Sequence, residues 1–276
     1  MNVETGGTPR DETTEPRHGL WLPVNESEAA LLGVVGAEAA DVRVLARLPL
    51  AIAFQRRWWM TSLAVGIVLC AYAYRSGPFL ALTVGLIAAA GTLVSVIAHE
   101  LGHALAARRA NGIEPRMIVV RSSGGVALVE GTFADARASA RFSAGGPLAS
   151  LLVAGAYLAI AFALPDGIFR TAVLFPAGVT LILTVANLLP IAPTDGYALF
   201  RAALWASLGS RQEAERRAVD WSRTMIGFAI LASVLVYYRD DRYGLAALLL
   251  VVTLAVQHYA GPGSLARSRA AARERR

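Results

Sequence analysis

A long uncharged, apolar block near the middle of the chain constrains what the protein can fold into. Residues 76–98 carry no charged side chain, which is enough for the roughly 20 apolar residues of a membrane-spanning helix. The segment His99-Glu100-Leu101-Gly102-His103 follows this block without interruption. An acid at the centre of a membrane costs roughly 2.5–3.5 kcal/mol, and less near an interface. Two histidines and a carboxylate in this setting therefore indicate a functional site.

The segment has the form H-E-x-x-H, and its spacing predicts a zinc site. On a helix, His99 and His103 lie one turn apart on the same face, so two imidazole nitrogens can bind one metal ion. Glu100 stands beside the first ligand, where a carboxylate can take a proton from a water that the metal activates. The alternative is a solvated helix end just outside the lipid, in which the same residues have no function.

Composition places the chain among membrane proteins. It has 276 residues, of which 55% are hydrophobic and 17% charged, and its mean hydropathy is +0.50. The apolar residues form long blocks, which excludes a soluble zinc peptidase. The net charge is +6, but the arginines lie between the apolar blocks, so we expect a lipid bilayer and no nucleic acid as partner. Cys70 is the single cysteine, and no disulfide or cysteine-based metal site is expected.

The apolar blocks predict an all-α polytopic membrane protein with about six transmembrane helices. We expect a cytoplasmic, partly disordered N-terminal segment over residues 1–57, a six-span membrane domain over 58–260 and a basic cytoplasmic tail over 261–276. No cleavable signal peptide is visible in the first 50 residues. The expected spans are residues 58–74, 78–107, 144–164, 171–192, 224–238 and 243–259.

Two segments outside these spans have recognisable patterns. Residues 29–54 are rich in Ala, Leu and Val with spaced charges, which fits one or two amphipathic helices on the membrane surface or a small soluble cap. Residues 117–121 and 126–130 are short β-prone runs, and Ser122-Ser-Gly-Gly125 between them is a turn signal. The second pattern predicts a small membrane-associated β-hairpin.

The arginines predict the orientation of the chain. Of the 26 basic residues, 22 are arginines in the N-terminal segment, residues 108–141, residues 201–223 and the tail. With six spans, these segments all lie on one side of the membrane, and the positive-inside rule makes that side the cytoplasm. Both termini are then cytoplasmic, and the H-E-x-x-H motif lies near the cytoplasmic end of the second span.

A catalytic zinc site needs a third protein ligand, and Asp195 is the best candidate. It follows the fourth span, whose end contains Pro190 and Pro193, and the topology brings it to the same side of the membrane as the motif. An exposed acid at a helix end is the alternative. His258 is a further possible ligand, although it lies near the end of the last span.

The sequence resembles the site-2 protease family of intramembrane zinc metalloproteases in four stretches, which occur in the order that the family has. His99–His103 matches the zinc motif, Arg116–Gly131 is similar to the family's β-hairpin, and Ala144-Gly-Gly-Pro-Leu-Ala-Ser150 is similar to its glycine-proline motif. Asn187-x-x-Pro190-x-x-Pro193-x-Asp195-Gly196 matches the second catalytic motif. Thr194 and Tyr197 depart from it, since leucine and a second glycine are usual there. No room for a PDZ or CBS domain is seen, so the chain looks like a minimal member.

This resemblance implies cleavage of membrane proteins or peptides in or near their transmembrane segments. One zinc ion per chain would be held by His99, His103 and Asp195, with Glu100 as general base. The resemblance also makes Asn187 and the hairpin residues Gly124, Gly125 and Val126 candidates for binding the substrate backbone. For Asn187, a hydrogen bond between two helices is an equally good explanation.

Two other functions are compatible with parts of the sequence. A zinc-bound membrane scaffold of the same fold, without proteolytic activity, would keep the same residues. A transporter would also have ionisable residues within its spans, but it would need inverted repeats or acids in several spans, and the other spans here are nearly free of charge. The bacterial inner membrane is the expected location of either the protease or the scaffold.

Overall fold

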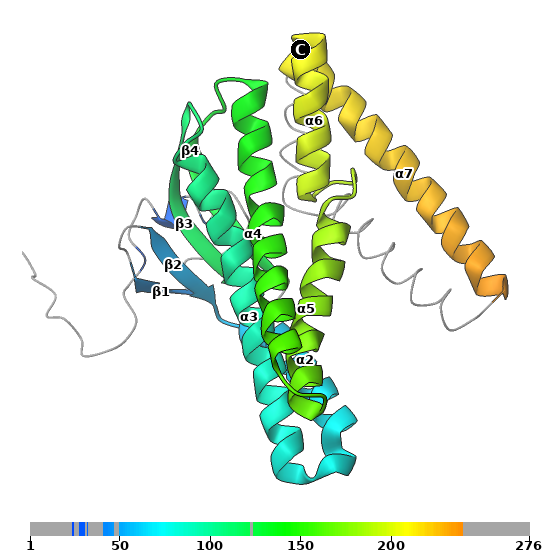
Figure 1. Ribbon diagram of the computed structural model, residues 1–276. Coiled ribbons are helices and arrows are strands. Elements are labelled where there is room, and N and C mark those ends of the chain that lie inside the picture. The colour runs from blue at the N-terminus through cyan, green and yellow to red at the C-terminus, as the bar shows by residue number, and fades with distance from the viewer. Residues whose placement is uncertain are drawn as a thin grey trace, which may run out of the picture.

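Long helices and one small β-sheet make up the protein (Figure 1). The computed structural model describes residues 24, 28–30, 32, 41–46, 50–121 and 124–239. In chain order the elements are β1 (Val42–Ala46), β2 (Ala51–Gln55), α2 (Trp59–Ala73), η2 (Tyr74–Ser76), α3 (Pro78–Ala107), β3 (Ile113–Arg121), β4 (Gly124–Gly131), α4 (Ala136–Ala163), α5 (Ile168–Asn187), α6 (Asp195–Leu208) and α7 (Arg211–Arg239).

The chain is an integral membrane protein, since four helices in its described part are long and apolar enough to cross a bilayer. These are α3, α4, α5 and the Arg211–Tyr237 part of α7. The six predicted spans are not all confirmed. The 15 residues of α2 rise about 22 Å, which is less than the roughly 30 Å of a hydrocarbon core. The sixth predicted span, residues 243–259, lies outside the described residues.

The glycine-proline motif does not open a helix, because α4 begins eight residues before Ala144, the predicted start of the third span. Helix α4 begins at Ala136, where the Asp135 carboxylate accepts a hydrogen bond of 2.7 Å from the backbone N–H of Ala138. The glycine-proline motif lies inside this helix and allows it to cross α3 closely. A Cβ atom on Gly145 would lie 2.4 Å from the carbonyl oxygen of Gly102. The glycines therefore serve helix packing here, as small residues do between membrane helices.

Residues 201–208 and 211–223 are helical, although their arginines predict a connection between two spans. The fourth span ends at Asn187, helix α6 begins at Asp195, and α7 starts at Arg211 rather than at 224. An exposed ion pair of 2.8 Å joins Glu213 to Arg217 one turn later. Such pairs stabilise the solvent-facing surface of a helix. The charged residues of α7 are therefore compatible with a helix that extends beyond its apolar part.

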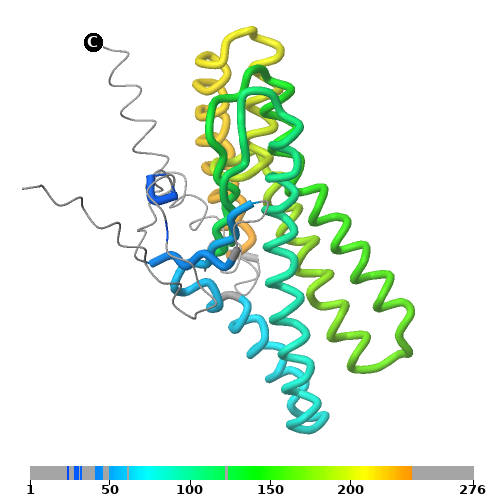
Figure 2. Tube along the Cα trace, turned by 90° about the vertical axis from the view of Figure 1, so that its left-hand side faces the viewer, coloured from blue at the N-terminus to red at the C-terminus, as the bar shows by residue number. Residues whose placement is uncertain are grey.

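The predicted hairpin belongs to a larger sheet. Strands β3 and β4 pair antiparallel, as expected, but β1 and β2 extend the sheet to four strands in the order β1-β2-β3-β4. Helices over residues 29–54 were therefore the wrong expectation for 42–46 and 51–55. Figures 1 and 2 show these two strands, in blue, beside the hairpin. Their alternation of buried and less buried side chains is the pattern of strands.

The sheet packs against the C-terminal part of α3. Leu50, Ala104 and Ile118 form a buried contact between the two. The opposite face of the sheet holds a second core, in which Val44 and Val119 are fully buried. This arrangement fixes the hairpin beside the helical turns that carry the H-E-x-x-H motif.

Candidate metal centre

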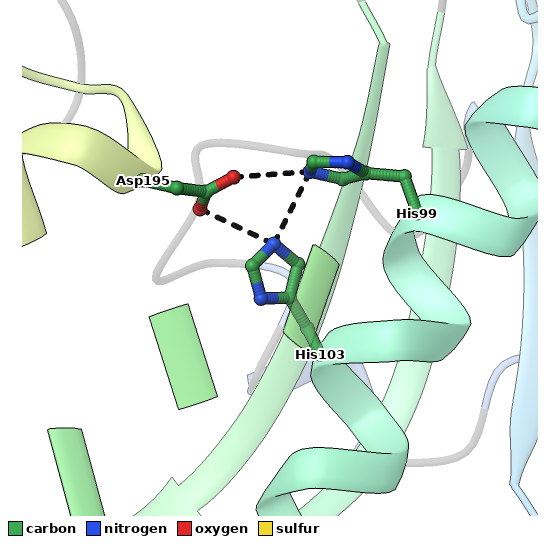
Figure 3. A group of neighbouring side chains, drawn as sticks. All are labelled: His99, His103 and Asp195. Atoms are coloured by element: carbon green, nitrogen blue, oxygen red, sulfur yellow. Dashed lines mark hydrogen bonds and ion pairs between the residues drawn. The ribbon is translucent and has the colours of Figure 1, made fainter. Parts of the chain in front are cut away.

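Three predicted ligands come together at the end of α3 that carries the motif. His99 and His103 project from successive turns of α3, and Asp195 is the first residue of α6 (Figure 3). Each residue offers a ligand atom, and the three atoms lie within 4.8 Å of one another. Segments about 90 residues apart thus meet where the sequence places them.

The close contacts among the three side chains fit a zinc site. The two Nε2 atoms are 3.2 Å apart, Asp195 Oδ2 lies 3.1 Å from Nε2 of His99, and Asp195 Oδ1 lies 3.2 Å from Nε2 of His103. Tetrahedral bonds of 2.0–2.1 Å separate ligand atoms by about 3.3 Å. Apart from this contact with His99, the buried Asp195 Oδ2 has no hydrogen-bond partner among the described residues, as expected of an atom that serves a metal ion.

The charge of Asp195 suits a ligand as well. Burial raises the pKa of its carboxyl, but the contacts with His103 and His99 lower this pKa by a larger amount. The net pKa therefore lies below the ordinary value. The carboxylate is therefore ionised at neutral pH, which metal binding requires.

Hydrogen bonds orient both histidine rings toward the metal position. Nδ1 of His103 is 2.7 Å from the carbonyl oxygen of Phe142, which can only accept, so Nδ1 carries the proton. Nδ1 of His99 lies 2.9 Å from the Ser150 hydroxyl. In both rings Nε2 is left to bind a metal, the arrangement usual for histidine ligands.

These orienting groups were not predicted as site residues. Ser150 lies within the glycine-proline stretch, and a hydroxyl in an apolar helix was the available signal for it. The contact with Phe142 uses a backbone carbonyl, so no side chain could have indicated it. Gly146 has a similar supporting function, because a Cβ atom there would lie 2.2 Å from His103 Nε2.

The side chain of Glu100 projects from α3 toward β4. This side chain is buried, with 6% of the residue exposed, and it accepts a backbone hydrogen bond from Ala127. A Cβ atom on Gly125 would lie 2.2 Å from Glu100 Cγ. The absence of a side chain at Gly125 therefore makes room for the carboxylate.

The other predicted substrate-binding residues differ in position. Asn187 lies at the end of α5, and its Nδ2 is 3.4 Å from His99 Nε2. Gly124 has open space around the Cβ position. Val126 packs against the sheet core on the face away from α3. A small cavity next to His99 is lined by Ser95, Val96, His99, Ser150, Thr180, Leu183, Thr184 and Asn187.

Comparison with known proteins finds relatives in sequence. The chain is 38% identical over 122 residues to the putative zinc metalloprotease Rip3 of Mycobacterium tuberculosis, covering 42% of this chain and 30% of Rip3. It is 31% identical over 130 residues to a putative zinc metalloprotease of Synechocystis, covering 47% of this chain and 34% of that protein. The chain thus spans about a third of the length of either relative. No family model matches it.

A solved structure shares the fold. The site-2 protease from Methanocaldococcus jannaschii superposes with a TM-score of 0.52 at 19% sequence identity, covering 77% of this chain and 91% of that structure. The chain is therefore related in sequence to two proteins named as zinc metalloproteases and has the fold of a site-2 protease, which confirms the resemblance to the site-2 protease family that its four motifs predict.

Proposed function

We propose that this protein is an intramembrane zinc metalloprotease, which cleaves peptide bonds in or near the transmembrane segments of its substrates. One observation carries the proposal. His99, His103 and Asp195 converge as a metal-binding group beside Glu100, and two of these ligands and Glu100 lie on a helix apolar enough to cross a membrane. Metal ligands with an adjacent carboxylate are the components of metal-assisted peptide hydrolysis.

Each site residue has a distinct task in this proposal. His99, His103 and Asp195 would hold one zinc ion, which would act as a Lewis acid to activate water and polarise the scissile carbonyl. Glu100 takes the proton of the attacking water and returns it to the leaving amine. Because Gly125 has no side chain, it leaves room for the Glu100 carboxylate beside the metal ligands. Asn187 can hydrogen-bond the substrate backbone.

A helical substrate has to be unwound before its peptide bond can be attacked, because all its backbone groups are paired. Strand β4 is an edge of the described sheet, whereas the outer edge of β3 pairs with β2. Of the two edge strands of the described sheet, β1 and β4, it is β4 that lies beside Glu100, and we therefore propose that an extended substrate segment adds there as a further strand. Gly125 on this strand lies against Glu100, so a paired segment would run past the general base.

Location and domain limits complete the proposal. We place the protein in a bacterial inner membrane with both termini in the cytoplasm, and the membrane domain within residues 58–260. The N-terminal segment contributes β1 and β2 to the sheet of this domain. Cleavage then takes place near the cytoplasmic face.

The proposal is tested on the detergent-purified full chain, its Glu100→Gln variant and a control variant, Glu114→Gln, which changes an exposed acid on β3. Zinc content and cleavage of a fluorescent single-span segment are measured in parallel. We expect about one zinc per chain in all three, with cleavage in the parent and the control only. Equal cleavage by Glu100→Gln would contradict the assigned role, and zinc without cleavage in every sample would support the scaffold instead.

A further inference from the structure

Asp195 is held by an irregular segment, which needs support from outside. Residues 188–194 separate α5 from α6 and contain Pro190 and Pro193, which have no backbone N–H. Most of the remaining N–H groups bond within the segment or to the end of α5. The N–H of Ala192 is different, because it donates to a side chain on another helix. A metal ligand at the end of such a segment has a defined position only if neighbouring elements fix it.

Helix α7 contacts the chain on both sides of Asp195. Three residues before it, the Ala192 N–H donates a 3.0 Å hydrogen bond to the hydroxyl of Ser222. Two residues after it, the Tyr197 hydroxyl donates a 2.9 Å hydrogen bond to the carboxylate of Glu215. Glu215 and Ser222 are seven residues apart, so they lie on the same face of α7. One face of α7 therefore holds the chain by a hydrogen bond before Asp195 and by another after it.

Packing supports these two hydrogen bonds. Ala192, Tyr197 and Ala218 form one buried cluster, and Ala218 lies on α7 between the two residues that form these bonds. Arg201 donates a 2.9 Å hydrogen bond to the second oxygen of Glu215, which holds the carboxylate toward Tyr197. Both ring and hydroxyl of Tyr197 are engaged, and only 5% of the residue is exposed.

We infer that this face of α7, formed by Glu215, Ala218 and Ser222, positions Asp195 for metal binding. Tyr197 and Ser222 are positioning residues, since they act through Asp195. The inference rests on the proposed function of Asp195 as a zinc ligand. It also gives a purpose to Tyr197, which stands where a glycine is usual in the resembling motif, because glycine has no side chain with which to reach α7.

The test measures zinc affinity by chelator competition, and the absorption spectrum of the cobalt-substituted protein, on the detergent-purified full chain. Tyr197→Phe removes the hydroxyl that donates to Glu215, and Ser222→Ala removes the hydroxyl that accepts from Ala192. We expect each to weaken zinc binding about tenfold, at the lower end of the effect known for groups that orient metal ligands, and to change the cobalt spectrum. Ser222→Thr retains a hydroxyl and is expected to restore most of the affinity.

Controls separate positioning from general stability. Glu213→Gln removes an exposed carboxylate on the same helix and should leave zinc affinity and the cobalt spectrum unchanged. Parental zinc affinity and spectrum in both Tyr197→Phe and Ser222→Ala would overturn the inference. It would equally be overturned if these variants lowered only the thermal midpoint of the metal-free protein. Unchanged zinc affinity in Asp195→Asn would instead contradict the proposed ligand itself, and the inference with it.

Discussion

Glycines around the metal centre act by their lack of a side chain, which leaves space for the ligands. Gly146 on α4 faces the His103 ring, and a Cβ atom there would lie 2.2 Å from the ligand nitrogen. We therefore expect Gly146→Ala to displace the ring and lower zinc affinity by at least about tenfold, which chelator competition measures. Gly155→Ala is the matched control on the same helix, because a Cβ atom there meets nothing within 4 Å. Equal affinity in both variants would show that α4 does not confine His103.

The Ser150 hydroxyl tests the orientation of the other histidine. It lies 2.9 Å from His99 Nδ1, so Ser150→Ala leaves that nitrogen without its partner. Loss of such a partner weakens metal binding about 10–100-fold, and we expect a fall in zinc affinity within this range. Ser207→Ala removes an exposed hydroxyl that bonds only its own helix, and it should have no effect. A fall of the same size in both variants would refute the assigned function of Ser150.

At the scale of elements, local sequence patterns correctly predicted features that depend on neighbouring residues in the chain. The H-E-x-x-H spacing was sufficient to place His99 and His103 together, and the prolines after Asn187 correctly ended α5 before Asp195. Strands β1 and β2 were missed because they are short, and because β2 pairs with β3 about 65 residues later in the chain. A parallel pairing across two intervening helices leaves no local signal, since the partner strand supplies the hydrogen bonds and the buried face.

The N-terminal strands are expected to support the sheet through their buried face. On β1, Val44 is fully buried whereas Leu45 next to it is 37% exposed. Val44→Asp would bury an unpaired charge, and we expect it to lower the free energy of unfolding by about 3 kcal/mol or more. Leu45→Asp places the same charge on the exposed face and should change stability little. Thermal unfolding in detergent, together with hydrogen exchange of the β3 amides, distinguishes the two variants.

At the scale of the whole molecule, the connections between the described helices divide between two ends. The segment that leads from α3 into the hairpin and α4 lies at the same end as the connection between α6 and α7 (Figure 1). The connections from α2 to α3 and from α4 to α5 lie at the opposite end. Arg108 and Arg109 directly follow α3 and Arg211 begins α7, whereas Arg75 lies in η2 before α3 and Arg170 lies in the first turn of α5. This arrangement agrees with the charge asymmetry from which the orientation is predicted.

The orientation itself can be measured with single cysteines, because Cys70 is the only native cysteine. In a Cys70→Ala background, Ser210→Cys and Asn111→Cys probe the arginine-rich end, and Asp166→Cys probes the opposite end at an exposed position. In intact cells we expect a membrane-impermeant maleimide to label position 166 only. Positions 111 and 210 should react after the cells are opened, since the positive-inside rule places them in the cytoplasm. The reverse labelling pattern would place the metal centre near the outer face of the membrane, and it would require substrates that are cleaved from that side.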